Sequence, residues 1–331
     1  MRIAIATDAW HPQINGVVTT LSRIGEQLRD RGHEVFLVTP GEFVTVPCPT
    51  YPEIRLAIRP RPTITRKLQN FSQQAIHIAT EGPIGLATRR YCVAQRCSFT
   101  TSLHTRFPEY VRLRVPVPLS WGYRYLRWFH RPAVRTLVSV PSLLSELAKC
   151  GLQHLVIWSR GVDLTLFQPR DKGFLQAKRP IFMYMGRVAV EKNVEAFLKL
   201  DLPGTKFVVG DGPDLQTLRK RYTDVRFVGY KVGLELACHV SVADVFVFPS
   251  RTDTFGLTIL EAMACGVPVA AYPVQGPLDL ICNGYNGYVD EDLQAAALRC
   301  LSVSPGNCRD FATRYSWASC TDQFLNQLCL T

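Results

Sequence analysis

Short apolar runs alternate along this 331-residue chain with longer segments in which apolar residues recur at helical spacing. Strands that alternate with helices in this way are typical of a parallel α/β sheet. The first strand leads through a loop with Asn15 and Gly16 into a helix that Gly32 ends. The predicted strands lie at 2–7, 34–40, 75–80, 98–104, 137–141, 154–159, 180–186, 206–212, 225–230, 244–250 and 267–273.

The alternation lapses between residues 160 and 180, in a segment with glycine, proline and mixed charge. This composition indicates an interdomain linker, which we place at 166–179 between domains 1–165 and 180–315. Each half then forms a doubly wound, Rossmann-like parallel sheet. We expect the two domains to face each other across a cleft lined by the carboxyl ends of their strands, because such sheets bind ligands there.

One glutamate interrupts an otherwise apolar helix that is predicted from about Phe255 to Cys265. A glutamate is almost never fully buried without a partner, so Glu261 needs one. Its carboxylate suits the paired hydrogen bonds of a ribose diol, and an internal salt bridge is the alternative. At the start of the same helix Gly256 leaves bare N–H donors for a phosphate oxygen, and Asp253 precedes it at the expected cleft.

Two cations follow the first strand of the second half, in the segment 185–193. Arg187 and Lys192 stand where a strand ends and a helix begins, a place where two cations can clamp a diphosphate. The alternative is a pair of solvated surface charges. The turn in 209–218 has two glycines that let the backbone pass under a nucleotide, although alone this signal is weak.

Two positions in the first half are further candidates. Gly16, at a helix entrance, either lets backbone N–H groups approach a phosphate or is a plain turn glycine. His104 either faces the expected cleft from the end of a strand or is a satisfied turn residue.

Several catalytic and metal-binding motifs are missing from the chain. It has no GxGxxG, HExxH or GxSxG motif and no cysteine cluster. The acidic triplet from Asp290 to Asp292 is better interpreted as acids that open a helix than as metal ligands. We therefore expect neither a dinucleotide fingerprint nor a metal site.

A set of short motifs, taken in order, covers almost the whole chain. These motifs are NGVVTTL, IHIATEGPIG, TSLHTRFPEY, SRGVDLTLFQP, GRVAVEKN, GDGP, SRTDTFGLTILEAMACGVPVAA and GYNGYV. With them the chain resembles the family-four retaining glycosyltransferases of the GT-B fold, which use a nucleotide-activated sugar as donor. The phrases IHIATEGP, HTRFPEY and SRTDTFG resemble most the GDP-mannose-dependent α-mannosyltransferases and related glycolipid-synthesising enzymes.

The resemblance implies a role for each candidate residue. Arg187 and Lys192 would bind the donor diphosphate, Glu261 the ribose hydroxyls and Asp253 the donor sugar, with His104 beside that sugar. Asp253 departs from the family's usual glutamate by one methylene, which shortens its reach. The implied catalytic residues are Arg187, Lys192, Asp253 and His104. The implied donor-binding residues are Gly16, Gly186, Arg187, Lys192, Asp253, Phe255, Gly256, Leu257 and Glu261.

The resemblance also implies retaining transfer without a metal, with cations and a helix N-terminus stabilising the departing diphosphate. No cofactor is expected, since the nucleotide sugar, GDP-mannose or a UDP-sugar, is a substrate. By the same resemblance a final helix at 316–331 would return to the first domain. Alternatives are a UDP-sugar-dependent transferase that makes a glycosyl-diacylglycerol or acts on a soluble or polysaccharide acceptor and, more remotely, a sugar-nucleotide epimerase.

Charge is concentrated in one part of the chain, whose formal net charge is +11. Between Arg55 and Arg135 there are fifteen Lys and Arg against two acids, Glu81 and Glu109. Such a region indicates a polyanionic partner: a membrane surface, a nucleic acid or a phosphorylated substrate. No nucleic-acid-binding motif accompanies the charge, so we expect no nucleic-acid partner.

The segment 118–135 favours a membrane surface. On a helix, Trp121, Tyr125 and Trp128 form one stripe beside a second stripe of arginines, a pattern typical of an interfacial helix. The alternative is that the aromatic side chains belong to the core.

Compartment follows from cysteine usage and from the start of the chain. Eleven scattered cysteines without a CxxC pair indicate reduced thiols in the cytosol, and the first residues do not form a signal peptide. We therefore expect a cytoplasmic protein, peripheral on the inner face of the cell membrane, acting on a lipid or glycan acceptor.

Overall fold

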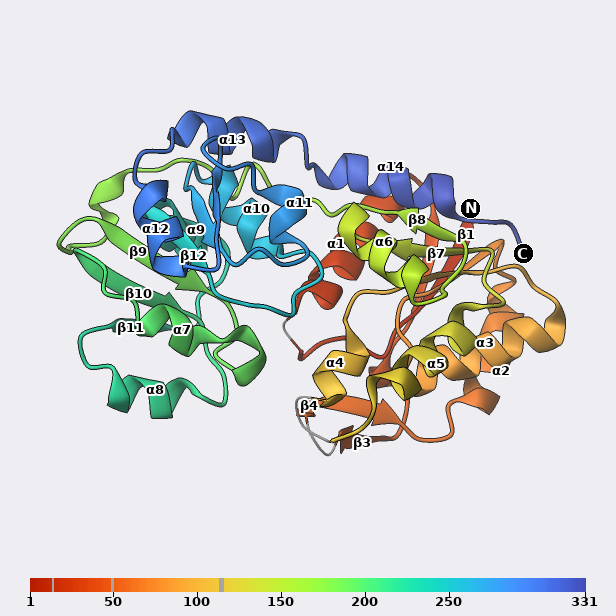
Figure 1. Cartoon of the computed structure of the whole chain (residues 1–331). Helices are drawn as coiled ribbons and strands as arrows, with labels where there is room; N and C mark the ends of the chain where they lie inside the picture. The colour runs from red at the N-terminus through yellow and green to blue at the C-terminus, as the bar shows by residue number, and fades with distance from the viewer. Residues whose placement is uncertain (14, 49–50, 113–115) are drawn as a thin grey trace. The chain divides into compact units, whose positions relative to one another are not determined.

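The computed structural model describes residues 1–13, 15–48, 51–112 and 116–331, and it divides into two compact units (Figure 1). Unit 1 comprises Met1–Arg160 and Trp317–Thr331, and unit 2 comprises Gly161–Ser316. Each unit contains a six-stranded sheet in which all neighbouring strands are parallel. The prediction of two doubly wound parallel sheets is confirmed.

Unit 1 has the strand order β2-β1-β5-β6-β7-β8. Its strands are β1 (Arg2–Ala6), β2 (Glu34–Val38), β5 (Ala75–Ile78), β6 (Thr100–Ser102), β7 (Arg135–Val138) and β8 (Leu155–Ile157). Its helices are α1 (Gly16–Asp30), α2 (Arg61–Phe71), α3 (Pro83–Gln95), α4 (Phe107–Arg112), α5 (Leu119–His130), α6 (Pro141–Lys149) and α14 (Trp317–Gln327). The chain order reverses between β1 and β5, so this is the point where a doubly wound sheet leaves a crevice.

Helices cover both faces of the unit 1 sheet, and the alternation of side chains along β1 shows how. Ile3 and Ile5 point into a cluster with residues of α1 and α14, whereas Ala4 and Ala6 point into a cluster with residues of α2, α3 and α5. Helix α14 is tied to unit 1 by Trp158, whose indole donates to the carbonyl of Cys320 at 3.0 Å and packs on Phe324.

Unit 2 has the strand order β11-β10-β9-β12-β13-β14. Its strands are β9 (Ile181–Met185), β10 (Thr205–Val209), β11 (Arg226–Gly229), β12 (Val245–Phe248), β13 (Val269–Ala271) and β14 (Gly287–Val289). Its helices are α7 (Val194–Leu198), α8 (Leu215–Arg221), α9 (Gly233–Val242), α10 (Leu257–Ala264), α11 (Pro277–Leu280), α12 (Leu293–Cys300) and α13 (Pro305–Thr313). The chain order reverses between β9 and β12.

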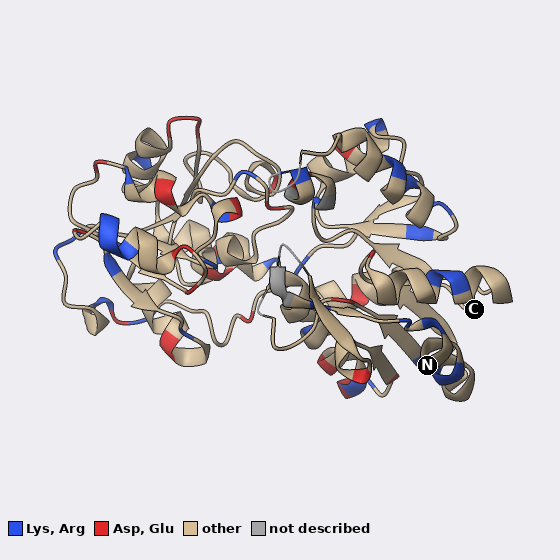
Figure 2. Ribbon diagram, turned by 90° about the horizontal axis from the view of Figure 1, so that it is seen from below, with Lys and Arg blue, Asp and Glu red and all other residues tan. Residues whose placement is uncertain are grey.

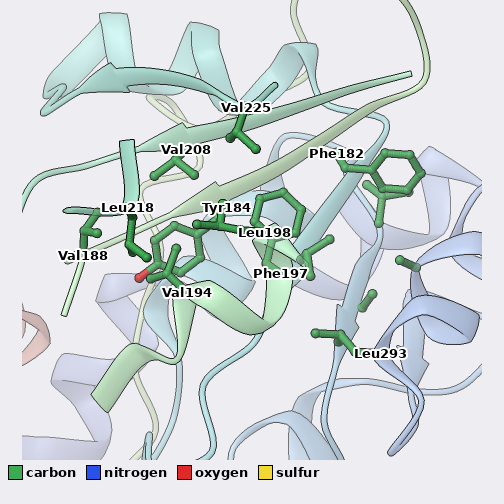
Figure 3. Packing of buried hydrophobic residues seen from close by; sticks show 14 of the residues in the cluster. Phe182, Tyr184, Val188, Val194, Phe197, Leu198, Val208, Leu218, Val225 and Leu293 are labelled. Carbon is green, nitrogen blue, oxygen red and sulfur yellow. The ribbon is translucent and has the colours of Figure 1, made fainter. Parts of the chain in front are cut away.

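One face of the unit 2 sheet packs on α7, α8 and α12 (Figure 3). Phe182 and Tyr184 of β9 meet Phe197 of α7 there, and Leu293 of α12 closes the same cluster. This apolar layer fixes the ends of β9 and β12 in space, and the candidate site is built on those ends.

The segment 166–179, predicted as a linker, lies within unit 2. The main-chain N–H of Arg170 donates to Ser241 Oγ at 2.6 Å, and Lys172 Nζ donates to the carbonyl of Ala243 at 2.6 Å. Arg309 of α13 donates to the carbonyls of Leu164 and Phe167. Hydrogen bonds to α9, to the residue after it and to α13 therefore hold this segment in place.

The structure adds elements that the apolar pattern did not predict. A two-stranded antiparallel ribbon joins β3 (Thr45–Cys48) and β4 (Tyr51–Ala57), and β14 forms the edge of the second sheet. The helix predicted from Phe255 begins later, at Leu257, because Gly256 has a φ of 88° that no helix accommodates. Asp292 accepts a hydrogen bond from the N–H of Ala295 at 3.0 Å, so the acidic triplet does open a helix.

Candidate functional site

The loops after β9 and β12 carry most of the predicted residues, and they meet at the switch point of the unit 2 sheet. β9 is hydrogen-bonded to both β10 and β12. Gly186 and Arg187 follow β9, and Asp253 follows β12. Doubly wound sheets bind their ligands at this place, since the loops diverge there and leave main-chain groups exposed.

Glycines bring the loops after β9 and β10 into close contact. A Cβ on Gly210 would stand 1.9 Å from the carbonyl oxygen of Gly186, and one on Gly212 would stand 2.3 Å from that of Val188. The N–H of Val188 donates to the carbonyl of Asp211 at 2.8 Å. The GDGP motif is therefore explained by backbone-to-backbone packing, which sets the position of Arg187 between Gly186 and Val188.

Arg187 and Glu191 form an ion pair, with Nε and Oε1 3.9 Å apart. Glu191 is almost fully buried, and its carbonyl accepts a hydrogen bond from the Thr252 hydroxyl at 3.1 Å. The main chain of Arg187 is held by the Tyr184 hydroxyl, which donates to its carbonyl at 2.7 Å. Arg187 is thus a half-buried cation beside a buried acid, and this environment differs from that of a fully solvated surface charge.

Lys192 and Asp253 are joined directly, because Lys192 Nζ lies 2.5 Å from Asp253 Oδ1. The other oxygen, Asp253 Oδ2, is buried and accepts no hydrogen bond from the described residues. Asn193 donates to the carbonyl of Pro249 at 3.1 Å and so ties the loop after β9 to the loop after β12. The structure therefore brings Lys192 and Asp253 together as one charged pair.

Gly256 precedes α10 with no side chain capping that helix. A Cβ there would lie 2.8 Å from Cδ1 of Ile259, so the backbone is packed as closely as glycine permits. Phe255 is buried and meets Tyr315 edge-on, with ring centroids 6.5 Å apart, so its ring anchors the loop. Leu257, half-buried, is the first residue of α10. The uncapped N-terminus favours an anion.

Glu261 lies on α10 among fully buried neighbours that include Leu260 and Ala262. Burial raises the pKa of its carboxyl group to about 7. Across residues 1–13, 15–48, 51–112 and 116–331, no side chain or main-chain group pairs with that carboxyl group. The predicted alternative, an internal salt bridge, is therefore absent from the described part of the chain.

Gly16 and His104 belong to unit 1. Gly16 begins α1, but the Asn15 side chain caps that helix and accepts from the N–H groups of Val17 and Val18, both at 3.0 Å. The N–H groups of Val17 and Val18 are thus already occupied by the protein. The predicted donor-binding role of Gly16 remains a prediction.

His104 follows β6 and is held by two hydrogen bonds. Its Nε2 lies 2.8 Å from Ser102 Oγ, and its Nδ1 lies 3.1 Å from Arg160 Nη2. Sequence reasoning missed Arg160, Ser102 and His77, which joins the same network through Ser102. A histidine in the middle of the apolar strand AIHI was the available signal, since a core strand rarely contains a polar residue without a partner.

Helix α5 exposes part of the predicted aromatic stripe. Trp121 is 60 % exposed and Trp128 is 47 % exposed, whereas Leu126 and Phe129 face the core. Tyr125 is half-buried and its hydroxyl donates to the carbonyl of Glu81 at 2.5 Å. The interpretation that both tryptophans are core residues is therefore wrong.

Three of the four arginines of 118–135 are also exposed. Arg124, Arg127 and Arg131 are exposed alongside the two tryptophans. Arg89 stacks on the Trp128 ring at 4.0 Å. Arg114, which also belongs to the basic stretch, lies outside the described residues.

Among the described residues no helix is long and apolar enough to span a bilayer. Within the same residues no group of three or more His, Cys, Asp or Glu side chains is arranged to hold a metal ion.

Two family models match the chain in tandem. Residues 14–166 match the model described as Glycosyltransferase Family 4, and residues 168–299 match the one described as Glycosyl transferases group 1. Together the two matches run from the loop after β1 in unit 1 as far as α12 in unit 2.

Individual proteins are similar over most of their length. A GDP-mannose-dependent alpha-mannosyltransferase of Corynebacterium glutamicum is 30% identical over 332 residues, covering 90% of this chain and 80% of that protein. An alpha-monoglucosyldiacylglycerol synthase of Streptococcus pneumoniae is 26% identical over 351 residues, covering 92% and 79%. The crystal structure of Anabaena Alr3699/HepE in complex with UDP-glucose is similar with a TM-score of 0.75 at 16% identity, over 98% of both chains. At that identity the likeness shows the GT-B fold.

Proposed function

This chain belongs to glycosyltransferase family 4, and on that premise we propose that it transfers mannose from GDP-mannose to a lipid or lipid-linked acceptor. Transfer retains the anomeric configuration, as the family does. The observation that carries the proposal is the charge arrangement at the β9–β12 switch point. There unit 2 contains the Lys192–Asp253 ion pair and the Glu261 carboxyl group, with which no described residue pairs. These groups are suited to bind a polar ligand.

The donor is proposed to bind unit 2 from phosphate to ribose. Arg187, Lys192 and the N-terminus of α10 bind the diphosphate, because each carries positive charge or bare N–H donors. Glu261, which is partly exposed, accepts hydrogen bonds from the ribose hydroxyls. Lys192 stays paired with Asp253 Oδ1 while it binds the diphosphate, and the other carboxylate oxygen, Asp253 Oδ2, accepts hydrogen bonds from the mannose hydroxyls.

Departure of the diphosphate needs positive charge that is already in place. Arg187, held by Glu191, and Lys192, held by Asp253, are oriented before the donor arrives. Preorganised groups of this kind stabilise developing charge without reorganising, so we propose that transfer proceeds without a metal or any other cofactor. His104 is proposed to lie beside the donor sugar.

The acceptor is proposed to reach unit 1 from an anionic membrane surface. Trp121 and Trp128 on α5 are exposed, and the stretch from Arg55 to Arg135 is strongly basic. Exposed tryptophans suit the headgroup region, and each nearby cation adds about 1 kcal/mol to binding of an anionic leaflet. The proposed location is the cytoplasmic face of the cell membrane, with peripheral attachment and no nucleic-acid partner.

A second donor class has a specific observation in its favour. The solved HepE structure contains UDP-glucose, and the Streptococcus pneumoniae relative is named as an alpha-monoglucosyldiacylglycerol synthase. The alternative is therefore a UDP-sugar-dependent enzyme that makes a glycosyl-diacylglycerol. It uses the same Arg187, Lys192 and Glu261, since these groups contact no part of the base.

A donor screen separates these possibilities. Purified protein is incubated with GDP-mannose, UDP-glucose or UDP-galactose and membrane lipid in EDTA, and release of the nucleoside diphosphate is measured. We expect GDP release that depends on the lipid. Release only from a UDP-sugar would establish the alternative, and conversion of a donor without any acceptor would indicate an epimerase.

A further inference from the structure

Five polar side chains of unit 1 form one continuous hydrogen-bonded chain that runs along β6 to the residues after its carboxyl end. His77 lies in β5 beside Thr100 of β6, Ser102 ends β6, and His104 follows it. The distances are 2.9 Å from Thr100 Oγ1 to His77 Nδ1 and 3.1 Å from His77 Nε2 to Ser102 Oγ. They continue with 2.8 Å from Ser102 Oγ to His104 Nε2 and 3.1 Å from His104 Nδ1 to Arg160 Nη2.

Arg160 ends this chain as a buried cation. It is 4 % exposed, and among the residues that the structure describes no carboxylate pairs with it. Its guanidinium stacks on Trp158 at 4.4 Å and donates to the carbonyl of Trp158 at 2.6 Å. A buried arginine without an acid is costly unless its N–H groups are hydrogen-bonded. Nη1 also donates to the carbonyl of Ser159 at 3.1 Å, and Nη2 points at His104.

The chemistry of arginine sets the direction of the hydrogen bonds. A guanidinium only donates, so His104 Nδ1 must accept with its lone pair. The proton of a neutral His104 then sits on Nε2 and is donated to Ser102 Oγ. The Ser102 hydroxyl in turn donates toward His77 Nε2, or toward the carbonyl of Ala79 at 3.4 Å. Either choice leaves the His104 tautomer unchanged.

The charged groups nearby favour the same neutral state of His104. Burial, then the positive charge of Arg160 and then His77, hold the pKa of His104 well below its ordinary value. Burial, with Arg160, lowers the pKa of His77 to about 3. Arg160 and His77 are the titratable groups that act on His104, and both oppose a second proton on its ring.

We propose that Arg160 is a positioning residue that locks His104 as a neutral imidazole with its proton on Nε2 and both ring nitrogens engaged within unit 1. His104 then presents an uncharged ring of fixed orientation beside the donor sugar, and it neither takes nor gives a proton during transfer. The catalytic consequence rests on the proposed function, whereas the tautomer does not.

The tautomer is tested in the full chain by NMR of histidines labelled with ¹⁵N in the ring. The His104→Gln variant assigns the His104 signals among those of the seven histidines. We expect a pyridine-type Nδ1 and a pyrrole-type Nε2 for His104, unchanged between about pH 5.5 and 8.5 where an ordinary histidine titrates. A protonated Nδ1, or a His104 that titrates near its usual value, would overturn the proposal.

Variants of Arg160 test its role as the lock. In Arg160→Met we expect His104 to become a mixture of the two neutral tautomers, whereas Arg160→Lys, which keeps a charged donor, restores the single tautomer. Identical spectra for wild type and Arg160→Met would contradict the assignment. The wild-type spectrum decides the tautomer even where Arg160→Met does not fold.

Steady-state kinetics test whether the contact between Arg160 and His104 affects sugar transfer. Arg160→Met is expected to lower kcat at least tenfold, toward the ~10²-fold cost of a misplaced catalytic group, and to leave the donor KM within about twofold. If the His104 spectrum changes and kcat does not, the proposal that the His104 tautomer affects transfer is refuted. Absence of any transfer in wild type would count against the proposed function and leave the NMR result standing.

Discussion

Glu261 shows how a single carboxyl group connects the stability of this protein with its proposed donor site. The residue lies on an apolar helix, and burial raises the pKa of its carboxyl group to about 7. A carboxyl group whose pKa is higher in the folded than in the unfolded chain favours folding while protonated. That advantage is lost as pH rises from about 4.5 to about 7. Above pH 7 the ionised group therefore destabilises unit 2 until a donor arrives.

Glu261→Gln is expected to separate these two effects. At pH 8 the variant should unfold at higher urea than wild type, with a gain of up to about 3 kcal/mol, and near pH 4.5 the two should match. Donor affinity, measured by calorimetry, should fall at least tenfold because an uncharged amide accepts ribose hydrogen bonds less well. Glu291→Gln, an exposed glutamate of the same unit, is the control. Wild-type donor affinity in Glu261→Gln would refute the ribose assignment.

Part of the candidate site can be predicted from the positions of the strand ends alone. The sequence predicts that Arg187, Lys192 and Asp253 lie together because the carboxyl ends of neighbouring parallel strands meet at one edge of a sheet. The sequence does not predict which acid pairs with which cation, because that depends on side-chain conformations. The buried Glu191 beneath Arg187 was missed for the same reason.

Replacing Lys192 tests the role of its charge. Lys192→Met should lower kcat by about 10²–10³, as expected when one preorganised group facing a developing charge is removed. Lys199→Met is the matched control, because Lys199 forms only an exposed pair with Glu195 and such pairs contribute little. Steady-state kinetics at saturating donor provide the comparison. Equal losses in the two variants would show that Lys192 does not act on the leaving group.

At the scale of elements, the loops after β9 and β10 depend on glycine. Gly210→Ala would place a methyl group 1.9 Å from a main-chain oxygen at a φ of 144°, so we expect unit 2 to lose more than about 2 kcal/mol of stability. Gly306→Ala, in α13 of the same unit with its nearest neighbour 3.6 Å away, should be nearly neutral. Thermal unfolding measures both. A Gly210→Ala protein as stable as Gly306→Ala would contradict the close packing of these loops.

The parallel strands were predictable because they read as continuous apolar runs between helices. The β3–β4 ribbon was not, since a proline such as Pro47 argues against a strand within a sheet. A two-stranded ribbon has free edges on which a proline loses no hydrogen bond. The edge strand β14 was missed because its residues GYV end a segment with glycine and asparagine and do not belong to a continuous apolar run.

At the scale of the whole molecule, basic residues extend over both units, and unit 1 carries the densest basic stretch of the sequence (Figure 2). The sequence alone predicts this concentration of basic residues, because it follows from the positions of Lys and Arg along the chain. The sequence does not predict the exposure of Trp121 and Trp128, because an aromatic stripe on a helix is equally typical of a core position.

Vesicle binding tests that surface. We expect cosedimentation with vesicles that contain anionic phospholipid, weakened by salt since screening reduces surface attraction. Trp121→Ser should bind more weakly, and Tyr230→Ser, an exposed aromatic of unit 2, should bind as wild type does. Equal binding to neutral and anionic vesicles, or equal effects of the two substitutions, would contradict a membrane surface on α5.

The most direct measurement is the product of a reaction with GDP-mannose, membrane lipid and EDTA, identified by mass spectrometry and by NMR of the anomeric proton. The account predicts a mannosyl lipid with the α configuration of the donor, formed by wild type and strongly reduced in Lys192→Met. A β-linked product, or one that appears only when a divalent metal is added, would contradict it.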